Sequence, residues 1–548
     1  MTPQRITPLQ ALALTLAAGA AAAIVVVWAT FALAGLISGN GTDAPTPGEA
    51  ARAIPELWNH RGDPSGALPP TVRQTRPRRA AVYAAGGIVL LCTTGALVGA
   101  GARLRQTTRG RGARFARAAD LRGLRVTGPT RGRVILGRHA RRLVAAEERH
   151  SVLIIGPTQS GKTTGLVIPA ILEHDGPLLA TSSKPDVLEI THHRRADLGP
   201  VLIYDPIGVS GHPSAGWTPL HDLVTWDDAQ AAARALMSAG AGTAGVTDES
   251  FWRSSAELLL APLLRAAVLH GEGMAAVVRW LSVGPAADDE VSELLQEAEA
   301  MAAAAWDGVR GTDPRTRSSV TLTARTVCAA WWDQRVLSLA HSDITPERIL
   351  SGASVFLVAP PHEQQRLAPV FAAITTQIIR HAQTVRARGT RPERPLLCVL
   401  DEAAHIAPIR ELPEIAATGA DAGVQLISVF QDTAQITHVY RDRARTVLNN
   451  HRARIFLGGI ADQQTLTEIS RSLGDLEIDR TSTTRGHQGS STTTSRSVQP
   501  LAPVNALREL PAGQALLLYG HRAPAMLRLR PWFKERGLKK LVGDAGET

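Results

Sequence analysis

One segment of the chain matches the pattern GxxxxGK[ST] at every fixed position: Gly156, Pro157, Thr158, Gln159, Ser160, Gly161, Lys162 and Thr163. A short apolar run, 152–155, precedes it, and the stretch that begins at Thr164 can form a helix. A strand, a glycine-rich loop and a helix in this order build a phosphate site from backbone N–H groups at a helix N-terminus. The chain is therefore expected to contain an α/β domain that binds a nucleotide.

The cofactors predicted for this loop are ATP and Mg²⁺. Lys162 is expected to reach the β- and γ-phosphates, and the Thr163 hydroxyl is expected to ligate Mg²⁺. The glycines allow the backbone to close around the phosphates. The expected cofactor-binding set is Gly156, Pro157, Thr158, Gln159, Ser160, Gly161, Lys162, Thr163 and Thr164.

Polar residues end two later apolar runs. Asp401 and Glu402 follow the run 396–400, and Gln431 follows the run 424–430. At strand ends beside the loop, Asp401 would hold Mg²⁺ through water and Glu402 would polarise the attacking water. Gln431 would sense the γ-phosphate or orient that water. Two simpler interpretations stay open, a solvated acid pair and an ordinary polar residue at a strand end.

Apolar runs alternate with helical stretches after residue 150, which predicts a mostly parallel sheet with helices on both faces. Three helical stretches between Lys162 and Asp401 lack intervening strands and suggest an inserted all-α domain. A Ser- and Thr-rich segment is expected to form a flexible loop. The predicted organisation is a membrane anchor at 1–102, a basic juxtamembrane segment at 103–142, a P-loop ATPase domain at 143–216 and 312–535, an all-α insertion at 217–311, a flexible loop at 481–497 and a tail at 536–548.

Two long uncharged runs, about 9–37 and 80–102, predict transmembrane helices joined by an outer loop at 38–79. Each is long enough to cross the ~30 Å hydrocarbon core of a bilayer. A cleaved signal is an alternative for the first run, although its apolar core is about twice the usual length. A buried soluble helix is an alternative for the second. The arginines after the second span place both termini and the ATPase domain in the cytoplasm, as a multi-pass protein of the cell membrane.

The net charge of +10 comes from one part of the chain. The segment 103–142 holds 13 arginines and a single acid, Asp120, so the remainder is close to neutral. A uniformly basic nucleic-acid-binding surface is thereby excluded. Two interpretations of the segment remain: a topology signal in contact with anionic lipid, and a site for DNA phosphates. The three cysteines lie far apart, which excludes a disulfide framework and a clustered cysteine zinc site.

These features together resemble one family, the type IV secretion coupling proteins, which are conjugative DNA-transfer ATPases. Within this family the chain resembles the actinobacterial type, and its Arg- and Ala-rich composition is typical of a GC-rich genome. The resemblance extends from about Arg133 to Trp532. It rests on the order of several blocks: the P-loop, Lys184, Thr191-His192-His193-Arg194-Arg195, Asp205-Pro206, Phe251-Trp252, Asp401-Glu402-Ala403, Gln431, Leu448-Asn449-Asn450 and Gly474.

The resemblance implies a membrane-anchored RecA-like motor that assembles as a homo-hexamer and carries an all-α domain that meets substrate. Its implied function is to couple ATP binding and hydrolysis to recruitment and transfer of a DNA–relaxase substrate into a type IV secretion channel. The implied partners are single-stranded DNA bound to a relaxase, the relaxase, secretion-channel membrane proteins and membrane lipid.

One departure from the family pattern concerns the arginine that relatives often supply to a neighbouring subunit's ATP. The segment 418–423, before Gln431, holds no basic residue, so such an arginine would have to come from elsewhere, with Arg452 and Arg454 as candidates. If neither serves, hydrolysis is expected to be slow or to need a partner. Two other functions remain open. One is a double-stranded DNA translocase of the chromosome-segregation type, although the segment after Trp532 is short for the winged-helix reader that such proteins usually carry. The other is an ATP-binding scaffold that recruits a relaxase without hydrolysis.

Overall fold

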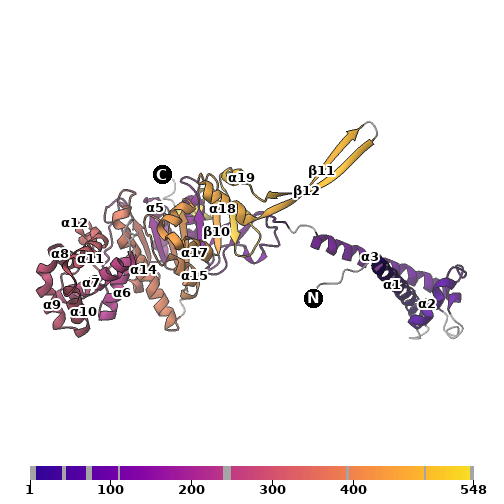
Figure 1. The fold of residues 1–548 in the computed structure, drawn as a ribbon, viewed down its shortest axis with the longest axis horizontal. Helices are drawn as coiled ribbons and strands as arrows, with labels where there is room; N and C mark the ends of the chain where they lie inside the picture. Colours follow the sequence, from indigo (N-terminus) through magenta and orange to yellow (C-terminus); the bar gives the residue numbers. More distant parts are fainter. Residues whose placement is uncertain are drawn as a thin grey trace. The chain divides into compact units, whose positions relative to one another are not determined.

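A computed structural model describes residues 8–39, 45–68, 77–108, 112–238, 249–390, 394–486 and 489–543. The chain divides into two compact units, 1–111 and 112–548, each described by itself below. Figure 1 shows the elements of both units in sequence colours.

The first unit is helical. Helices α1 (Pro8–Ile37) and α3 (Arg79–Thr108) pack against each other and coincide with the two predicted spans, with α3 continuing past residue 102. The segment between them forms α2 (Pro47–Glu56) and a short 3-10 helix (Pro64–Ala67). Only 11% and 17% of the most apolar windows of the two long helices are buried. Side chains this apolar and this exposed suit lipid contact better than the core of a soluble protein, the alternative considered for the second run.

The second unit is built on a mixed sheet that has twelve strands within the described residues. Its parallel part follows the order β10 (Ala453–Leu457), β4 (Val152–Ile155), β9 (Val424–Phe430), β8 (Leu396–Leu400), β5 (Leu178–Ser182), β7 (Ser354–Val358) and β6 (Val201–Tyr204). These strands are mostly apolar and almost completely buried, as expected when both faces are covered. Antiparallel strands extend the sheet beyond β10: β13 (Gln514–Tyr519), β14 (Ala525–Arg528), β2 (Ile135–His139), β3 (Arg142–Ala145) and β1 (Arg125–Val126).

Helices cover both faces of this sheet and enclose one large hydrophobic core on each. One face carries α4 (Ile168–Glu173), α5 (Asp186–Leu198) and α20 (Arg536–Val542). The other carries α14 (Gln364–Ala387), α15 (Leu412–Ala422), α16 (Thr433–Tyr440), α17 (Ala444–Asn450), α18 (Gln463–Leu473) and α19 (Val504–Arg508). The predicted α/β class is confirmed, and the apolar runs 152–155, 396–400 and 424–430 form β4, β8 and β9.

The helical region between β6 and β7 is longer than predicted and shares the core of the sheet. It comprises α6 (Trp226–Ser238), α7 (Glu249–His270), α8 (Met274–Val283), α9 (Asp288–Gln296), α10 (Ala300–Arg310), α11 (Pro314–Val327), α12 (Gln334–Leu337) and α13 (Pro346–Leu350). The boundary predicted at residue 311 falls between α10 and α11. Buried residues of α11, such as Val320 and Ala324, join the same cluster as the sheet residues Val355 and Leu357. No break in apolar packing marks this boundary.

The basic segment 103–142 is not a separate juxtamembrane segment throughout. Its C-terminal part forms β1 and β2 of the sheet, so the folded α/β unit begins before the predicted residue 143. Several arginines of the segment have internal partners: Arg114 pairs with Asp120 at 2.6 Å, and Arg138 pairs with Glu535 at 2.8 Å. Arg109 and Arg111 lie outside the described residues. The structural use of these guanidinium groups reduces the charge available for DNA phosphates.

Two further predictions are wrong at the C-terminal end. The expected flexible loop at 481–497 lies within a hairpin of β11 (Asp475–Gly486) and β12 (Gly489–Pro500), which projects from the sheet in Figure 1. Backbone pairing along both strands replaces the apolar core that this composition lacks. The expected polar tail begins with helix α20, whose Leu538 and Val542 are buried. These two residues are four apart and so share one helix face, which packs against α4 and α5.

Candidate nucleotide-binding site

The loop 156–163 connects β4 to a π-helical turn, Thr163–Val167, that continues into α4. The structure shows why two positions of this loop are glycine. A Cβ on Gly156 would lie 2.9 Å from the Cβ of Leu457 on the neighbouring strand, so a side chain is excluded there. Gly161 has φ +88°, a conformation that L side chains rarely adopt. Thr158 and Gln159 are exposed at the tip of the loop. The strand–loop–helix context predicted from the sequence is present.

Lys162 is buried and turned toward its own loop. Its Nζ donates hydrogen bonds to the carbonyl oxygens of Gly156 at 2.5 Å and Pro157 at 2.7 Å. Burial lowers the pKa of Lys162, while the nearby carboxylates of Asp401 and Glu402 act to raise it. An ammonium group bound to two carbonyls can exchange them for phosphate oxygens, because charge-assisted bonds to phosphate are stronger.

Asp401, at the end of β8, meets the loop directly. The Thr163 hydroxyl donates a hydrogen bond to Asp401 Oδ2 at 3.1 Å, although the two residues are far apart in sequence. The Thr181 hydroxyl fixes the Asp401 backbone carbonyl from β5 at 3.0 Å. Burial raises the pKa of the Asp401 carboxyl to about 6, against the hydrogen bond from Thr163, which lowers it. A hydroxyl and a carboxylate in contact form a hard oxygen donor set of the kind Mg²⁺ prefers, so the residues fit this ion.

Strand β9 lies between β4 and β8, so its end is next to the loop. The pair Ile155 and Phe430 is in register, and the Gly156 N–H donates to the Phe430 carbonyl at 3.2 Å. Gln431 is the next residue and is half-buried. The expected placement of Gln431 on the strand beside the loop agrees with this geometry.

Two glutamines that were not selected from the sequence, Gln435 and Gln364, form hydrogen bonds to the polar residues of the site. Gln435 accepts a hydrogen bond from the Gln431 N–H through Oε1 at 2.9 Å, and its Nε2 lies 3.2 Å from His405 Nε2. Asp432 caps the same helix by accepting from the Gln435 N–H. The pattern Asp-x-x-Gln is a helix-start signal that could have identified Gln435.

Glu402 sits in a strained backbone position, with φ +57°. Its Oε2 accepts a long hydrogen bond, 3.4 Å, from Nε2 of Gln364, a buried residue at the start of α14. A non-glycine residue in this region costs roughly 1–3 kcal/mol and persists when its surroundings hold it. No local pattern connects these two residues, which meet only through the order of the strands.

Arg452 and Arg454, the predicted suppliers of a charge to a neighbouring subunit, lie at the start of β10. The register pairs Ala453 with Val152 and Phe456 with Ile155, so both arginines are at the opposite end of the strands from the loop of their own chain. Arg452 is exposed, whereas Arg454 is half-buried, and burial lowers the pKa of its guanidinium. Arg452 is therefore the better placed of the two to reach another subunit.

The family model described as "Type IV secretory system Conjugative DNA transfer" matches residues 123–545, which include the whole candidate site. The chain belongs to this family. Among curated relatives, Protein VirD4 of Rhizobium radiobacter is 23% identical over 417 residues, 73% of this chain and 59% of the relative. Conjugal transfer protein TraG of Escherichia coli is 25% identical over 311 residues, 52% of this chain and 48% of the relative.

This coupling-protein chain thus spans about three fifths of the length of the VirD4 relatives that it matches. The solved structures of the conjugative coupling protein TrwB share its fold. An unbound form lacking an N-terminal segment gives a TM-score of 0.60 at 21% identity, covering 77% of this chain and 93% of that one. TrwB in complex with ADP and Mg²⁺ gives a TM-score of 0.54 at 20% identity, covering 77% and 94%. The α/β fold with its large, mostly parallel sheet is common to both proteins.

Proposed function

We propose that this protein is a membrane-anchored ATPase that couples ATP binding and hydrolysis to the transfer of DNA in conjugation. The hydrogen bond from the Thr163 hydroxyl to Asp401 Oδ2 carries the proposal, because it joins the loop to the acidic strand end as a Mg²⁺–nucleotide site requires. The family match and the solved complex of TrwB with ADP and Mg²⁺ support ATP and Mg²⁺ as cofactors.

Each residue of the site has one proposed role. The backbone N–H groups of the loop and Lys162 bind the phosphates, while Thr163 and Asp401 hold Mg²⁺, which supplies neutralising charge when bound. Glu402 accepts a proton from the attacking water, and Gln431 orients that water. Gln364 and Gln435 position Glu402 and Gln431 through the contacts described above.

The substrate and partners follow from family membership. We propose a relaxase-bound single strand of DNA as cargo, with the relaxase, channel membrane proteins and anionic lipid as further partners, and a homo-hexamer as the working assembly. The exposed apolar faces of α1 and α3 support an anchor in the cell membrane, with both termini and the ATPase unit in the cytoplasm. The actinobacterial type, to which the resemblance pointed, belongs to the same proposal.

The function can be tested with the full chain in detergent and in the cells from which it comes. We expect Mg²⁺-dependent ATP hydrolysis that single-stranded DNA stimulates, and conjugal transfer that stops when the gene is deleted and returns with the wild-type gene. ATP binding without turnover, with or without DNA, would instead support the recruitment scaffold. Stimulation by duplex DNA alone, together with unaffected transfer, would support a chromosome-segregation translocase.

The proposed ring can be tested by mixing two inactive variants. If Arg452 acts on the nucleotide of a neighbouring subunit, Arg452→Ala should lose most turnover while its own phosphate loop stays intact. Mixed with Lys162→Ala, it should regain part of the activity, because some interfaces then combine an intact loop with an intact arginine. The measurement is ATP hydrolysis at fixed total protein. An Arg452→Ala variant with wild-type turnover, or a mixture as inactive as its components, would rule out this role.

A further inference from the structure

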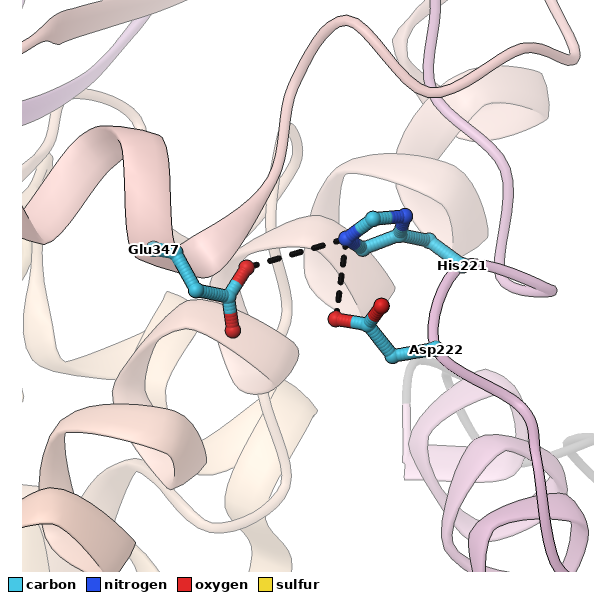
Figure 2. A group of neighbouring side chains, drawn as sticks. All are labelled: His221, Asp222 and Glu347. Carbon is cyan, nitrogen blue, oxygen red and sulfur yellow. Dashed lines mark ion pairs between the residues drawn. The ribbon is translucent and has the colours of Figure 1, made fainter.

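A group of histidines and carboxylates lies outside the nucleotide site, at the base of the helical region. His221 and Asp222 belong to the loop before α6, and Glu347 is on α13. His221 Nε2 is 2.9 Å from Asp222 Oδ2 and 3.6 Å from Glu347 Oε2. Figure 2 shows both carboxylates directed at the same ring nitrogen. One ligand atom from each residue lies within 4.8 Å of the others, so the three donors surround one point.

A fourth residue and a cavity complete the arrangement. His381 of α14 contacts the far oxygen of Glu347, with Nδ1 3.0 Å from Oε1, so Glu347 lies between two imidazoles. A cavity of about 230 Å³ opens beside the group and is lined by His221, Asp222, Glu347 and His381. Asp222 and Glu347 are 63% and 50% exposed, which leaves them accessible to an ion from solvent.

The charge balance of the group differs from that of a similar group nearby. His270, Glu272 and Glu290 also lie close together, but Arg279 donates to both of those carboxylates and neutralises them. In the described part of the chain, the ion pairs of Asp222 and Glu347 are with histidines alone. A histidine compensates a carboxylate only when it is protonated. A divalent cation does so when the ring is neutral, with the ring nitrogen as a ligand.

We propose that His221, Asp222 and Glu347 bind a zinc ion, with the fourth coordination position open to the cavity. Ligand atoms about 2.1 Å from one tetrahedral zinc ion lie roughly 3.4 Å apart, so small side-chain rotations bring these donors onto the metal. An imidazole ligand favours zinc over magnesium or calcium, whose sites are built from oxygen atoms. His381 orients Glu347 from behind, as outer partners of metal-bound carboxylates commonly do.

The position of the site gives the ion a structural consequence. The loop with His221 and Asp222 leads into the helical region, and α13 leads out of it to β7. A metal bound by both segments would link the start of the helical region to its end, at the place where this region joins the sheet. Cross-links between segments distant in sequence restrict the unfolded chain more than local ones. Zinc should therefore reduce local opening at this junction, independently of nucleotide.

The test is a zinc titration of the full chain in detergent, without nucleotide. Excess Mg²⁺ is present to occupy weaker cation sites built from oxygen ligands. We expect one equivalent of Zn²⁺ to bind and Co²⁺ to give a visible absorption band at the same site. Glu347→Gln and Asp222→Asn should each weaken binding by at least about tenfold, and His381→Gln should weaken it by about 10–100-fold. Hydrogen exchange should slow in 217–225 and α13 on zinc addition.

A matched control is available in His341, which pairs with Asp343 at 2.9 Å without a third carboxylate in the described structure. His341→Gln should bind zinc as the wild type does. Because Asp222 and Glu347 are exposed, their variants should fold, and retained Mg²⁺–ATP binding would verify this. The inference is overturned if the wild type binds no zinc under Mg²⁺ competition. It is equally overturned if Glu347→Gln and Asp222→Asn bind zinc as tightly as the His341→Gln control.

Discussion

Lys162→Ala should lower ATP turnover by about 100- to 1000-fold, the usual loss when one preorganised donor to developing charge is removed. The Lys162 ammonium is buried, and the Asp401 and Glu402 carboxylates act to keep it charged. Within the described structure, its Nζ donates hydrogen bonds to two carbonyls of its own loop. Alanine would leave the phosphates without that charge. The measurement is the rate of phosphate release by the full chain with Mg²⁺ and ATP.

Glu402→Gln, measured in the same assay of phosphate release, should separate ATP hydrolysis from ATP binding. The amide keeps the size of the carboxylate but cannot accept the proton from water, so turnover should fall by about 100-fold or more while nucleotide stays bound. The matched control for Lys162→Ala is Lys539→Ala, which also removes one lysine charge but from an exposed position on α20, and it should hydrolyse ATP as the wild type does. Equal turnover by wild type and Glu402→Gln would show that another group acts as the base.

The parts of the fold that were predictable from sequence are those with a local signal. The run 152–155 and the loop after it define a strand and a phosphate site within a dozen residues. The run 396–400 ends in Asp401 because a buried parallel strand is apolar up to its edge. Asp401 meets Thr163 through the strand order, yet each carries its own motif. Each was therefore predicted as a Mg²⁺ ligand from its own motif, whereas their direct contact depends on the sheet.

The features that sequence reasoning missed depend on partners distant in the chain. Gln364 touches Glu402 only because β7 and β8 flank β5 in the sheet, and a glutamine at the start of a helix has no pattern of its own. The short strands β1 and β2 lie in the arginine-rich segment 103–142, where the many charged residues hide the pattern of apolar positions. The hairpin β11–β12 is held by backbone pairing, which side-chain composition does not encode.

Arg195→Ala should reduce the free energy of unfolding of the α/β unit by about 3–5 kcal/mol. Arg195, on α5, is completely buried and belongs to one of the blocks that first indicated the family. Its guanidinium donates to the Ser354 hydroxyl at 2.8 Å, the His174 carbonyl at 2.7 Å and the Gly176 carbonyl at 2.6 Å. Burial lowers the pKa of Arg195 to about 10, so it stays protonated at neutral pH and donates all three bonds.

The expected loss follows from the acceptors that alanine leaves behind. Each buried acceptor without a donor costs about 1–3 kcal/mol, and because the three share one donor their effects do not add in full. The neighbouring Arg194 is partly exposed and is the matched control, with an expected loss of about 1 kcal/mol. Urea unfolding followed by tryptophan fluorescence compares the two variants. If Arg195→Ala unfolded at the same urea concentration as Arg194→Ala, Arg195 would have to act elsewhere, because a fork that joins α5, β7 and the 174–176 turn cannot be removed without a stability cost.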